Sequence, residues 1–412
     1  MIMQLFGLLV VAQLNIFPAF NLFRLGADSY RLFAHYQSLY ILLFEVPFFA
    51  VMRFFSRNED SVKCNAPLLR ISILSPFLPV ILLALLAVFW TVALEYGLLF
   101  RRLGHEELQA VQAGVPTLLL YFYRLAVESA VFVVLFLGIV LRYSPKDASH
   151  ISLYRVTFLI YISSFMAFFL LNSRMQLIVF ALAAICVFGK AWGRNNPARY
   201  MFLGMVLFFA AMMHTIWREV VVESNGRVLV NSIWDALSAS LKLMLDRIDT
   251  MNVIYRIGDR GLDPWEPHFS SIRDLFSFYW SFFFNQQAYL AIKGSLLTSP
   301  SVQIANLYLP DLLVDFPKTM AMDVLLIFGA SGLPVFGVVL GVVCVSVQRG
   351  VARSQMADGA FITALYILPL LFQFEKEFSG FFFATIKWLP ILLVVYYFRP
   401  GKEIHSVESV KC

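Results

Sequence analysis

Charged side chains are scarce in this 412-residue chain, at 14% of all residues. Because roughly a quarter of the residues in soluble globular proteins are charged, this scarcity excludes an ordinary soluble domain. Hydrophobic residues make up 60% of the chain, and Phe alone occurs 42 times. These proportions predict an all-α polytopic membrane protein whose helices face lipid.

Other absences narrow the function. The sequence has no GxGxxG, Walker A, CxxC or HExxH motif, no internal repeat and no coiled-coil heptads. No set of residues has metal-ligand spacing, so we expect neither a cofactor nor a metal site. The basic residues are scattered between apolar segments, which does not fit nucleic-acid binding. None of the cysteines lies in a loop expected outside the cytoplasm, so no disulfide is predicted for Cys64, Cys186, Cys344 and Cys412.

Apolar windows of about 17–25 residues mark transmembrane helices, and the chain contains about ten of them. The first window lacks a basic leader and a small-residue cleavage site, so we expect it to be a retained span. The windows lie at 2–20, 34–53, 73–94, 117–141, 153–171, 175–189, 200–217, 324–347, 357–373 and 379–398.

Lys and Arg in the short loops predict the orientation, because cytoplasmic loops carry the excess of positive charge. With a cytoplasmic N-terminus, these loops hold Arg53, Arg57, Lys63, Arg70, Arg142, Lys146, Lys190, Arg194, Arg199, Arg349 and Arg353. The C-terminus is then cytoplasmic as well. The chain divides into about seven spans over 1–217, a large loop outside the cytoplasm over 218–318, about three spans over 319–398 and a tail over 399–412.

The loop at 218–318 is the one long polar interval in the chain. Apolar residues recur at helical spacing between Ile233 and Ile248, which predicts an amphipathic helix lying on the bilayer. The aromatic segment 274–284 is expected to dip into the interface. Gly and Pro residues break any helix over 258–267.

Three arginines lie in or before the turn predicted at 258–267. Arg247 ends the predicted amphipathic helix, and Arg256 and Arg260 follow it. Guanidinium groups match the oxygens of pyrophosphate bidentately, so a turn at Gly258 that folds them together would form a phosphate clamp. The alternative is that they snorkel to the lipid headgroups. Arg174 opens a span in a tight hairpin on the same side, where it either lines the site or anchors the helix.

Further charges lie at or within the apolar windows. Arg124 and Glu128 are four residues apart, so they share a helix face and can pair. We favour a structural pair over a functional one, although charges inside a membrane are costly and often functional. Glu45, Asp323 and Lys387 could line an aqueous cavity.

A general base would come from the same turn of the loop. His268, Asp259, Asp263 and Glu266 lie in it or beside it, and His214 lies near the outer end of its span. The alternative is that each is an ordinary solvated residue, because surface loops normally carry such side chains.

The pattern resembles the Wzy-type family of O-antigen, or oligosaccharide repeat-unit, polymerases. The similarity covers most of the chain as architecture: about ten spans and a large Arg-rich loop late in the sequence. Locally it includes Arg-x10-Gly from Arg247 to Gly258 and the Ser173–Arg174 pair at a helix start. It also includes the Gly-rich span FGASGLPVFGVVLG at 328–341.

This resemblance implies a multi-pass bacterial inner-membrane enzyme whose periplasmic loop contains interfacial helices. The substrate would be a glycan on undecaprenyl pyrophosphate, and the reaction would be glycosyl transfer that joins repeat units. Arg174, Arg247, Arg256 and Arg260 would stabilise the departing lipid pyrophosphate. His268, Glu266 or Asp259 would take the proton of the acceptor hydroxyl.

The expected partners are membrane lipids and, in the same pathway, a flippase and a chain-length regulator. Because the leaving group is already activated, neither a nucleotide sugar nor a metal is required. The alternatives are an O-antigen ligase, which transfers glycan to the lipid A core, a glycolipid flippase or other transporter, and a purely structural membrane subunit. A transporter is disfavoured because transporters tend to show inverted repeats and short loops.

Overall fold

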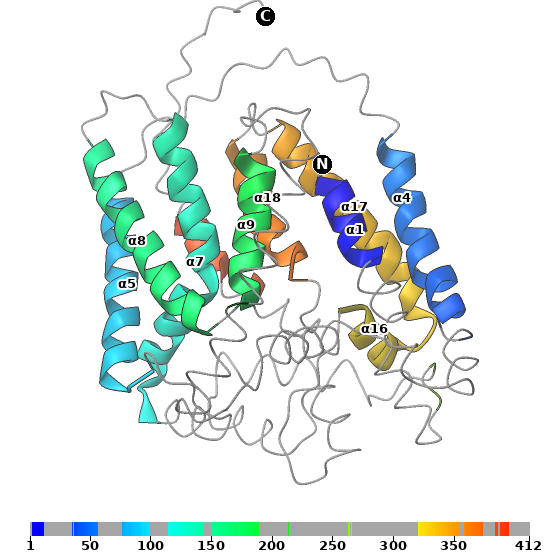
Figure 1. The fold of residues 1–412 in the computed structure, drawn as a ribbon, viewed down its shortest axis with the longest axis horizontal. Helices are drawn as coiled ribbons and strands as arrows, with labels where there is room; N and C mark the ends of the chain where they lie inside the picture. The colour runs from blue at the N-terminus through cyan, green and yellow to red at the C-terminus, as the bar shows by residue number, and fades with distance from the viewer. Residues whose placement is uncertain are drawn as a thin grey trace, which may run out of the picture. The chain divides into compact units, whose positions relative to one another are not determined.

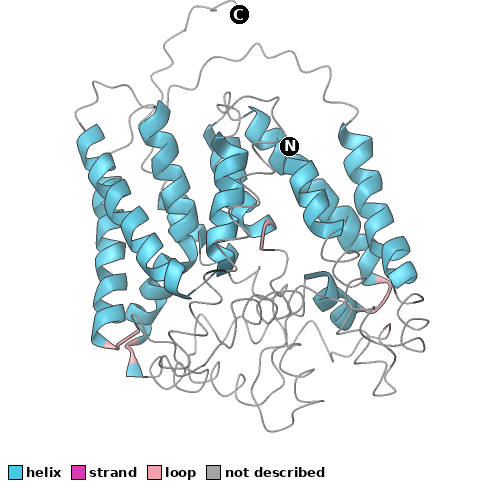
Figure 2. Ribbon diagram, viewed as in Figure 1, coloured by secondary structure: helices cyan, strands magenta, loops and turns pink. Residues whose placement is uncertain are grey.

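The computed structural model describes residues 2–11, 35, 37–56, 76–98, 114–143, 150–172, 174–188, 213, 263, 265, 320–353, 358–373, 384–385 and 388–394. Every regular element within these residues is a helix, and none of them forms a strand (Figure 2). The predicted all-α fold is therefore confirmed for the part of the chain that is described. The physical reason is that lipid offers no hydrogen-bond partners, whereas a helix pairs its own backbone N–H and C=O groups.

The helices lie close to the predicted windows (Figure 1). Within the described residues, five helices are long and apolar enough to cross a membrane: Gln37–Phe55, Phe77–Glu95, Leu118–Arg142, Ile151–Phe168 and Gly332–Ala352. The elements in chain order are α1 (Ile2–Val11), η2 (Ile41–Glu45), α4 (Val46–Ser56), α5 (Phe77–Glu95), α7 (Thr117–Tyr143), α8 (Ile151–Asn172), α9 (Arg174–Phe188), α16 (Met320–Phe328), α17 (Gly332–Arg353) and α18 (Asp358–Leu371).

In the part of the chain that the structure describes, three further apolar helices have 10–17 residues, and they belong to α1, α9 and α18. The short span predicted at 175–189 corresponds to α9, whose 15 residues rise only about 22 Å against a hydrocarbon core of roughly 30 Å. The predicted span at 200–217 lies outside the described residues except for Met213. The one at 379–398 is described only at 384–385 and 388–394.

One predicted span is wrong at its N-terminal end. The window 324–347 is not one helix, because α16 ends at Phe328 and α17 begins at Gly332. Gly329 lies between them with a φ of 67°, a left-handed conformation that terminates helices and that glycine adopts without a Cβ clash. We call residues 329–331 the elbow. The membrane-length helix is 332–352.

The chain forms two compact units, each described here by itself. The first unit comprises Met1–Ser61, Trp234–Ser346 and Gln373–Phe383. The second unit comprises Val62–Ile233, Val347–Phe372 and Ala384–Cys412. The linear division into 1–217, 218–318, 319–398 and 399–412 stays a prediction.

The second unit is built around α7, against which α5, α8, α9 and α18 pack (Figure 1). Residues 131–137 of α7 are all buried, as expected of a helix that is apolar on every side and covered by neighbours. The ring of Phe132 lies 6.3 Å from that of Tyr366 and 6.0 Å from that of Trp388, measured between centroids. The core of this unit is therefore aliphatic and aromatic.

Within this unit α5 and α8 run in the same direction. The Tyr161 hydroxyl donates a hydrogen bond of 2.6 Å to the carbonyl of Leu82, 79 residues away. The ring centroids of Phe89 and Phe168, separated by the same number of residues, are 4.8 Å apart. A constant offset along both helices requires parallel packing.

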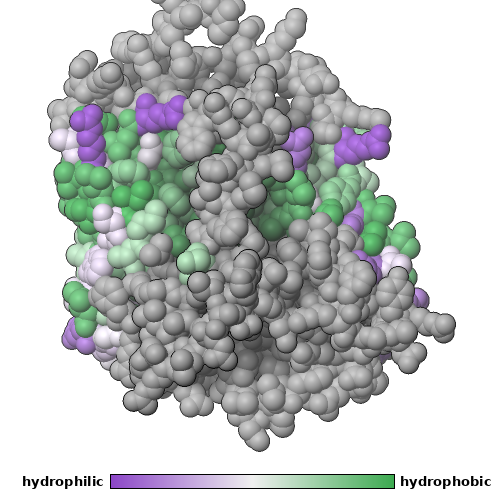
Figure 3. Space-filling model, viewed as in Figure 1, coloured by the Kyte–Doolittle hydropathy of each residue, from purple (hydrophilic) through white to green (hydrophobic). Residues whose placement is uncertain are grey.

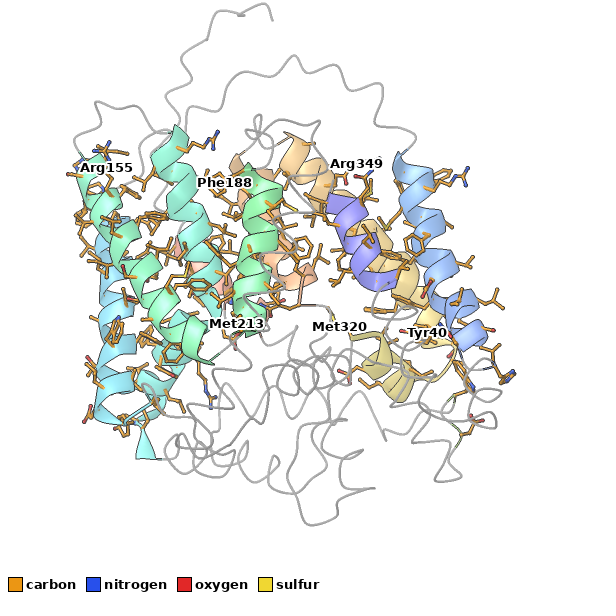
Figure 4. All side chains as sticks on the ribbon, viewed as in Figure 1. Tyr40, Arg155, Phe188, Met213, Met320 and Arg349 are labelled. Atoms are coloured by element: carbon orange, nitrogen blue, oxygen red, sulfur yellow. The ribbon has the colours of Figure 1, made fainter. Side chains whose placement is uncertain are left out.

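Exposed arginines lie at one end of the second unit. Arg142 occupies the last turn of α7 and Arg155 the start of α8. The Arg142 guanidinium lies 5.9 Å from the ring centre of Phe188, the last residue of α9. Figure 4 shows Arg155 and Phe188 toward the same end, and Figure 3 shows hydrophilic patches at helix ends with hydrophobic surface along the helices. This distribution suits helices that end at a membrane surface.

The first unit contains a close parallel contact between the segment η2–α4 and α17. A Cβ built on Gly337 would lie 2.6 Å from the Phe44 carbonyl oxygen. A Cβ on Gly341 would lie 3.1 Å from the Phe48 carbonyl oxygen. Both pairs have the same offset, so the two helices run in parallel. Small residues four apart permit such an approach between membrane helices.

A π-helical turn, η2, precedes α4 in this contact. The N–H of Val46 bonds to the carbonyl of Ile41, five residues earlier. Pro47 follows immediately and has no N–H, so the usual bond to the residue four before it cannot form. The change to π-helical pairing is a local response to this missing donor. It leaves Glu45 buried.

Candidate functional site

Most of the residues predicted for the site lie outside the described part of the chain. These are Arg247, Arg256, Gly258, Asp259, Arg260, Glu266 and His268. Their roles stay predictions. Two residues of the same turn, Asp263 and Trp265, are described, and they show how this part of the predicted loop meets the helices.

The predicted intramembrane pair lies on α7. Arg124 and Glu128 are both half-buried, and their spacing of four residues puts them on one face of a continuous helix. This geometry is compatible with the structural pair that we favour from the sequence. Arg174 begins α9, as the tight hairpin predicts.

The elbow between α16 and α17 has a defined hydrogen-bond pattern. The N–H of Gly329 donates to the Leu325 carbonyl at 2.8 Å, the single bond that characterises a left-handed helix cap. The N–H of Gly332 returns to the Gly329 carbonyl at 3.1 Å. A Cβ on Gly332 would lie 3.1 Å from a methyl group of Val324. The two helices are therefore packed tightly where they meet.

A contact joins the predicted loop to this elbow. The N–H of Ala330 donates to the carbonyl oxygen of Trp265 at 2.9 Å. The N–H of Trp265 in turn donates to the Asp263 carboxylate, also at 2.9 Å. Asp263 thus closes a local turn on its own chain, and the carbonyl at the end of that turn binds the elbow. We call Asp263–Trp265 the docking turn.

Buried polar side chains lie in the first unit, which also contains the elbow and the docking turn. Glu45 is 6% exposed, and Tyr40 and Asp323 are fully buried. The Tyr40 hydroxyl has no hydrogen-bond partner among the described residues. Figure 4 shows Tyr40 and Met320, the first residue of α16, toward the same end of the unit. Glu45 lies within the apolar helix Gln37–Phe55, where an ionisable residue is by default a candidate functional residue.

Sequence reasoning identified some of these residues and missed others. Glu45 and Asp323 stand out as charges in apolar windows, and Asp263 belongs to the predicted turn. The sequence suggests that Asp263 is a candidate base, whereas in the structure its carboxylate accepts a hydrogen bond from the backbone N–H of Trp265. The sequence does not single out Tyr40. No group of His, Cys, Asp or Glu able to hold a metal occurs among the described residues.

Comparison with known proteins gives no match to a family model, a curated protein or a solved structure.

Proposed function

We propose that this protein is a membrane glycosyltransferase of the O-antigen polymerase type. In this proposal it joins oligosaccharide repeat units carried on undecaprenyl pyrophosphate, at the periplasmic face of the bacterial inner membrane. The observation that carries the proposal is an Arg-rich polar interval between membrane helices whose docking turn is bonded to the elbow of α16 and α17.

The chemistry follows from a substrate that is half lipid and half anion. The acceptor hydroxyl oxygen forms a bond to the anomeric carbon of the donor glycan. The bond from that carbon to the pyrophosphate oxygen breaks, and its electron pair leaves with the lipid carrier. Negative charge develops on the pyrophosphate, where Arg174, Arg247, Arg256 and Arg260 would stabilise it. The proton of the hydroxyl passes to a base.

An amphipathic substrate explains why cations should lie at a membrane surface. The polyprenyl chain stays in lipid, so the pyrophosphate is held near the ends of the spans. An interfacial loop presents guanidinium groups there without placing them in the hydrocarbon core, where a charge is costly. Arginine suits this role better than lysine because its planar fork binds two oxygens at once.

Replacing Arg247 by Ala tests the proposal. Losing one charge-assisted contact of about 1.5–3 kcal/mol slows the transition state by roughly 10- to 150-fold. Cells carrying Arg247→Ala should therefore display a lipid A core with a single repeat unit instead of a ladder of chain lengths, at normal protein abundance. The measurement is gel electrophoresis of the surface polysaccharide.

Two matched variants sharpen this experiment. Arg247→Lys keeps the charge but loses the fork, so it should restore the ladder only in part. Arg227→Ala, in the same predicted loop, should be mild. A normal ladder from Arg247→Ala would make this arginine a headgroup anchor and remove the site assignment. A surface without any glycan would instead indicate ligation or export.

A further inference from the structure

One segment of the first unit combines a buried carboxyl group, a buried hydroxyl group and an irregular helical turn. Glu45 is 6% exposed and Tyr40 is fully buried, and both lie within the apolar helix Gln37–Phe55. The π-helical turn η2 runs from the residue after Tyr40 to Glu45. Single π-helical turns occur frequently at functional sites, and an ionisable residue inside a membrane span is by default a candidate functional residue. The segment therefore has two independent marks of a site.

The π-helical turn places Tyr40 and Glu45 on one face of the helix. In an α-helix, side chains five residues apart point about 140° away from each other. A π-helical turn bonds an N–H to the carbonyl five residues before it, as the Val46 N–H does with Ile41 here, so the fifth residue returns close to the first. The exposures agree with this geometry, because Tyr40 and Glu45 are buried whereas Leu42 and Val46 are 61% and 52% exposed. The two side chains also lie near enough to interact electrostatically.

The helices that pack against this segment present hydrophobic side chains to it. The ring of Phe336 in α17 lies 5.7 Å from that of Phe44, and the ring of Phe6 in α1 lies 5.9 Å from that of Phe48, measured between centroids. A charged carboxylate is costly in such surroundings, and binding a proton neutralises it. The other ionisable side chains that the structure describes on these elements and on α16 are those of His35, Arg53, Cys344, Arg349 and Asp323.

We propose that Glu45 is a proton-binding site within the membrane and that the Tyr40 hydroxyl donates a hydrogen bond to its ionised form. On release, the O–H bond of the carboxylic acid breaks, its electron pair stays on the carboxylate, and the proton passes to water. Glu45 is eight residues, or about 12 Å, from the end of the span at Gln37, and Tyr40 lies between them. The Tyr40 hydroxyl has no partner among the described residues, and a buried hydroxyl is stabilised by gaining an acceptor. This inference goes beyond glycosyl transfer and does not depend on it.

Labelling with dicyclohexylcarbodiimide tests the site in native membranes. This apolar reagent adds to a protonated carboxyl group, and mass spectrometry locates the N-acylurea that forms. Glu45 should be labelled at mildly acidic pH, and the labelled fraction should fall as the pH is raised and the carboxyl group ionises. Glu95, an exposed carboxyl group at the end of α5, is the control and should stay unlabelled because water stabilises its charged form. Equal labelling of Glu45 at every pH, or none at any pH, would overturn the proposal, because its proton would then never exchange.

Two substitutions of tyrosine by phenylalanine test the hydroxyl. Tyr40→Phe keeps the ring that packs 5.6 Å from that of Phe44 but removes the donor to the carboxylate. The pH at which half of Glu45 is labelled should therefore rise by about 1–2 units, the effect of one hydrogen bond to a charged group. Tyr161→Phe, which changes a buried tyrosine of the second unit, should leave this midpoint unchanged. An unchanged midpoint in Tyr40→Phe would remove Tyr40 from the site. The labelling of Glu45 in the native chain decides the proton site even if a variant fails to fold.

Discussion

Gly337 is the described position where a new side chain meets the protein backbone most closely outside its own helix. An added Cβ would lie 2.6 Å from the Phe44 carbonyl oxygen and 3.4 Å from the Phe48 nitrogen. A backbone atom cannot rotate away, so Gly337→Ala forces α17 and the η2–α4 segment apart. Overpacking of this kind costs about 1–3 kcal/mol, and the better helix propensity of Ala offsets about 1 kcal/mol. We expect a net loss of up to about 2 kcal/mol, seen as a fall of at most a few degrees in Tm.

The assay is thermal unfolding of the purified protein in detergent, followed by tryptophan fluorescence. Gly341→Ala should have a smaller effect, because its closest contacts would be 3.1 Å. Gly114→Ala is the matched control, since a Cβ there would meet nothing within 4 Å. Equal stability of the Gly337 and Gly114 variants would refute the close contact of α17 with η2 and α4.

Two further predictions concern the topology and the second unit. Reporter fusions at Asn195 and Asn225 should report opposite compartments, because the loop charges place the first in the cytoplasm and the second outside it; the same compartment for both would overturn the topology. Tyr161→Phe should lower the free energy of unfolding by about 1 kcal/mol through loss of the hydrogen bond to the Leu82 carbonyl, and an unchanged Tm in the detergent assay would contradict that contact.

The apolar spans could be predicted from sequence because membrane-helix length is a local property. The windows 73–94 and 117–141 agree within a few residues with the apolar helices Phe77–Glu95 and Leu118–Arg142. A window average measures only hydropathy, and the elbow residues Gly, Ala and Ser are not polar enough to divide the apolar window into two. The end of α16 is instead decided by the backbone angle of Gly329, which hydropathy does not encode.

The candidate site could be predicted only as a region. The sequence indicates that the turn at 258–267 is rich in charge, and it suggests several candidate bases within it. It cannot indicate that the Trp265 carbonyl binds the Ala330 N–H, because every residue carries a backbone carbonyl and every residue except proline carries a backbone N–H. The side chain of Asp263 was therefore interpreted by its acidity alone, whereas its backbone-directed hydrogen bond defines its role in the docking turn.

The glycines of the Gly-rich segment 328–341 have different structural roles, which the sequence motif alone does not distinguish. Gly329 is required for a left-handed φ, where a side chain costs about 1–2 kcal/mol through its own backbone. Gly337 has no such conformation and is required because another helix lies against it. The first glycine provides the donor that binds the loop, and the second sets the distance between two membrane helices. A single segment of sequence therefore carries the loop attachment and the helix packing as separate properties, and substitutions at the two glycines should separate them.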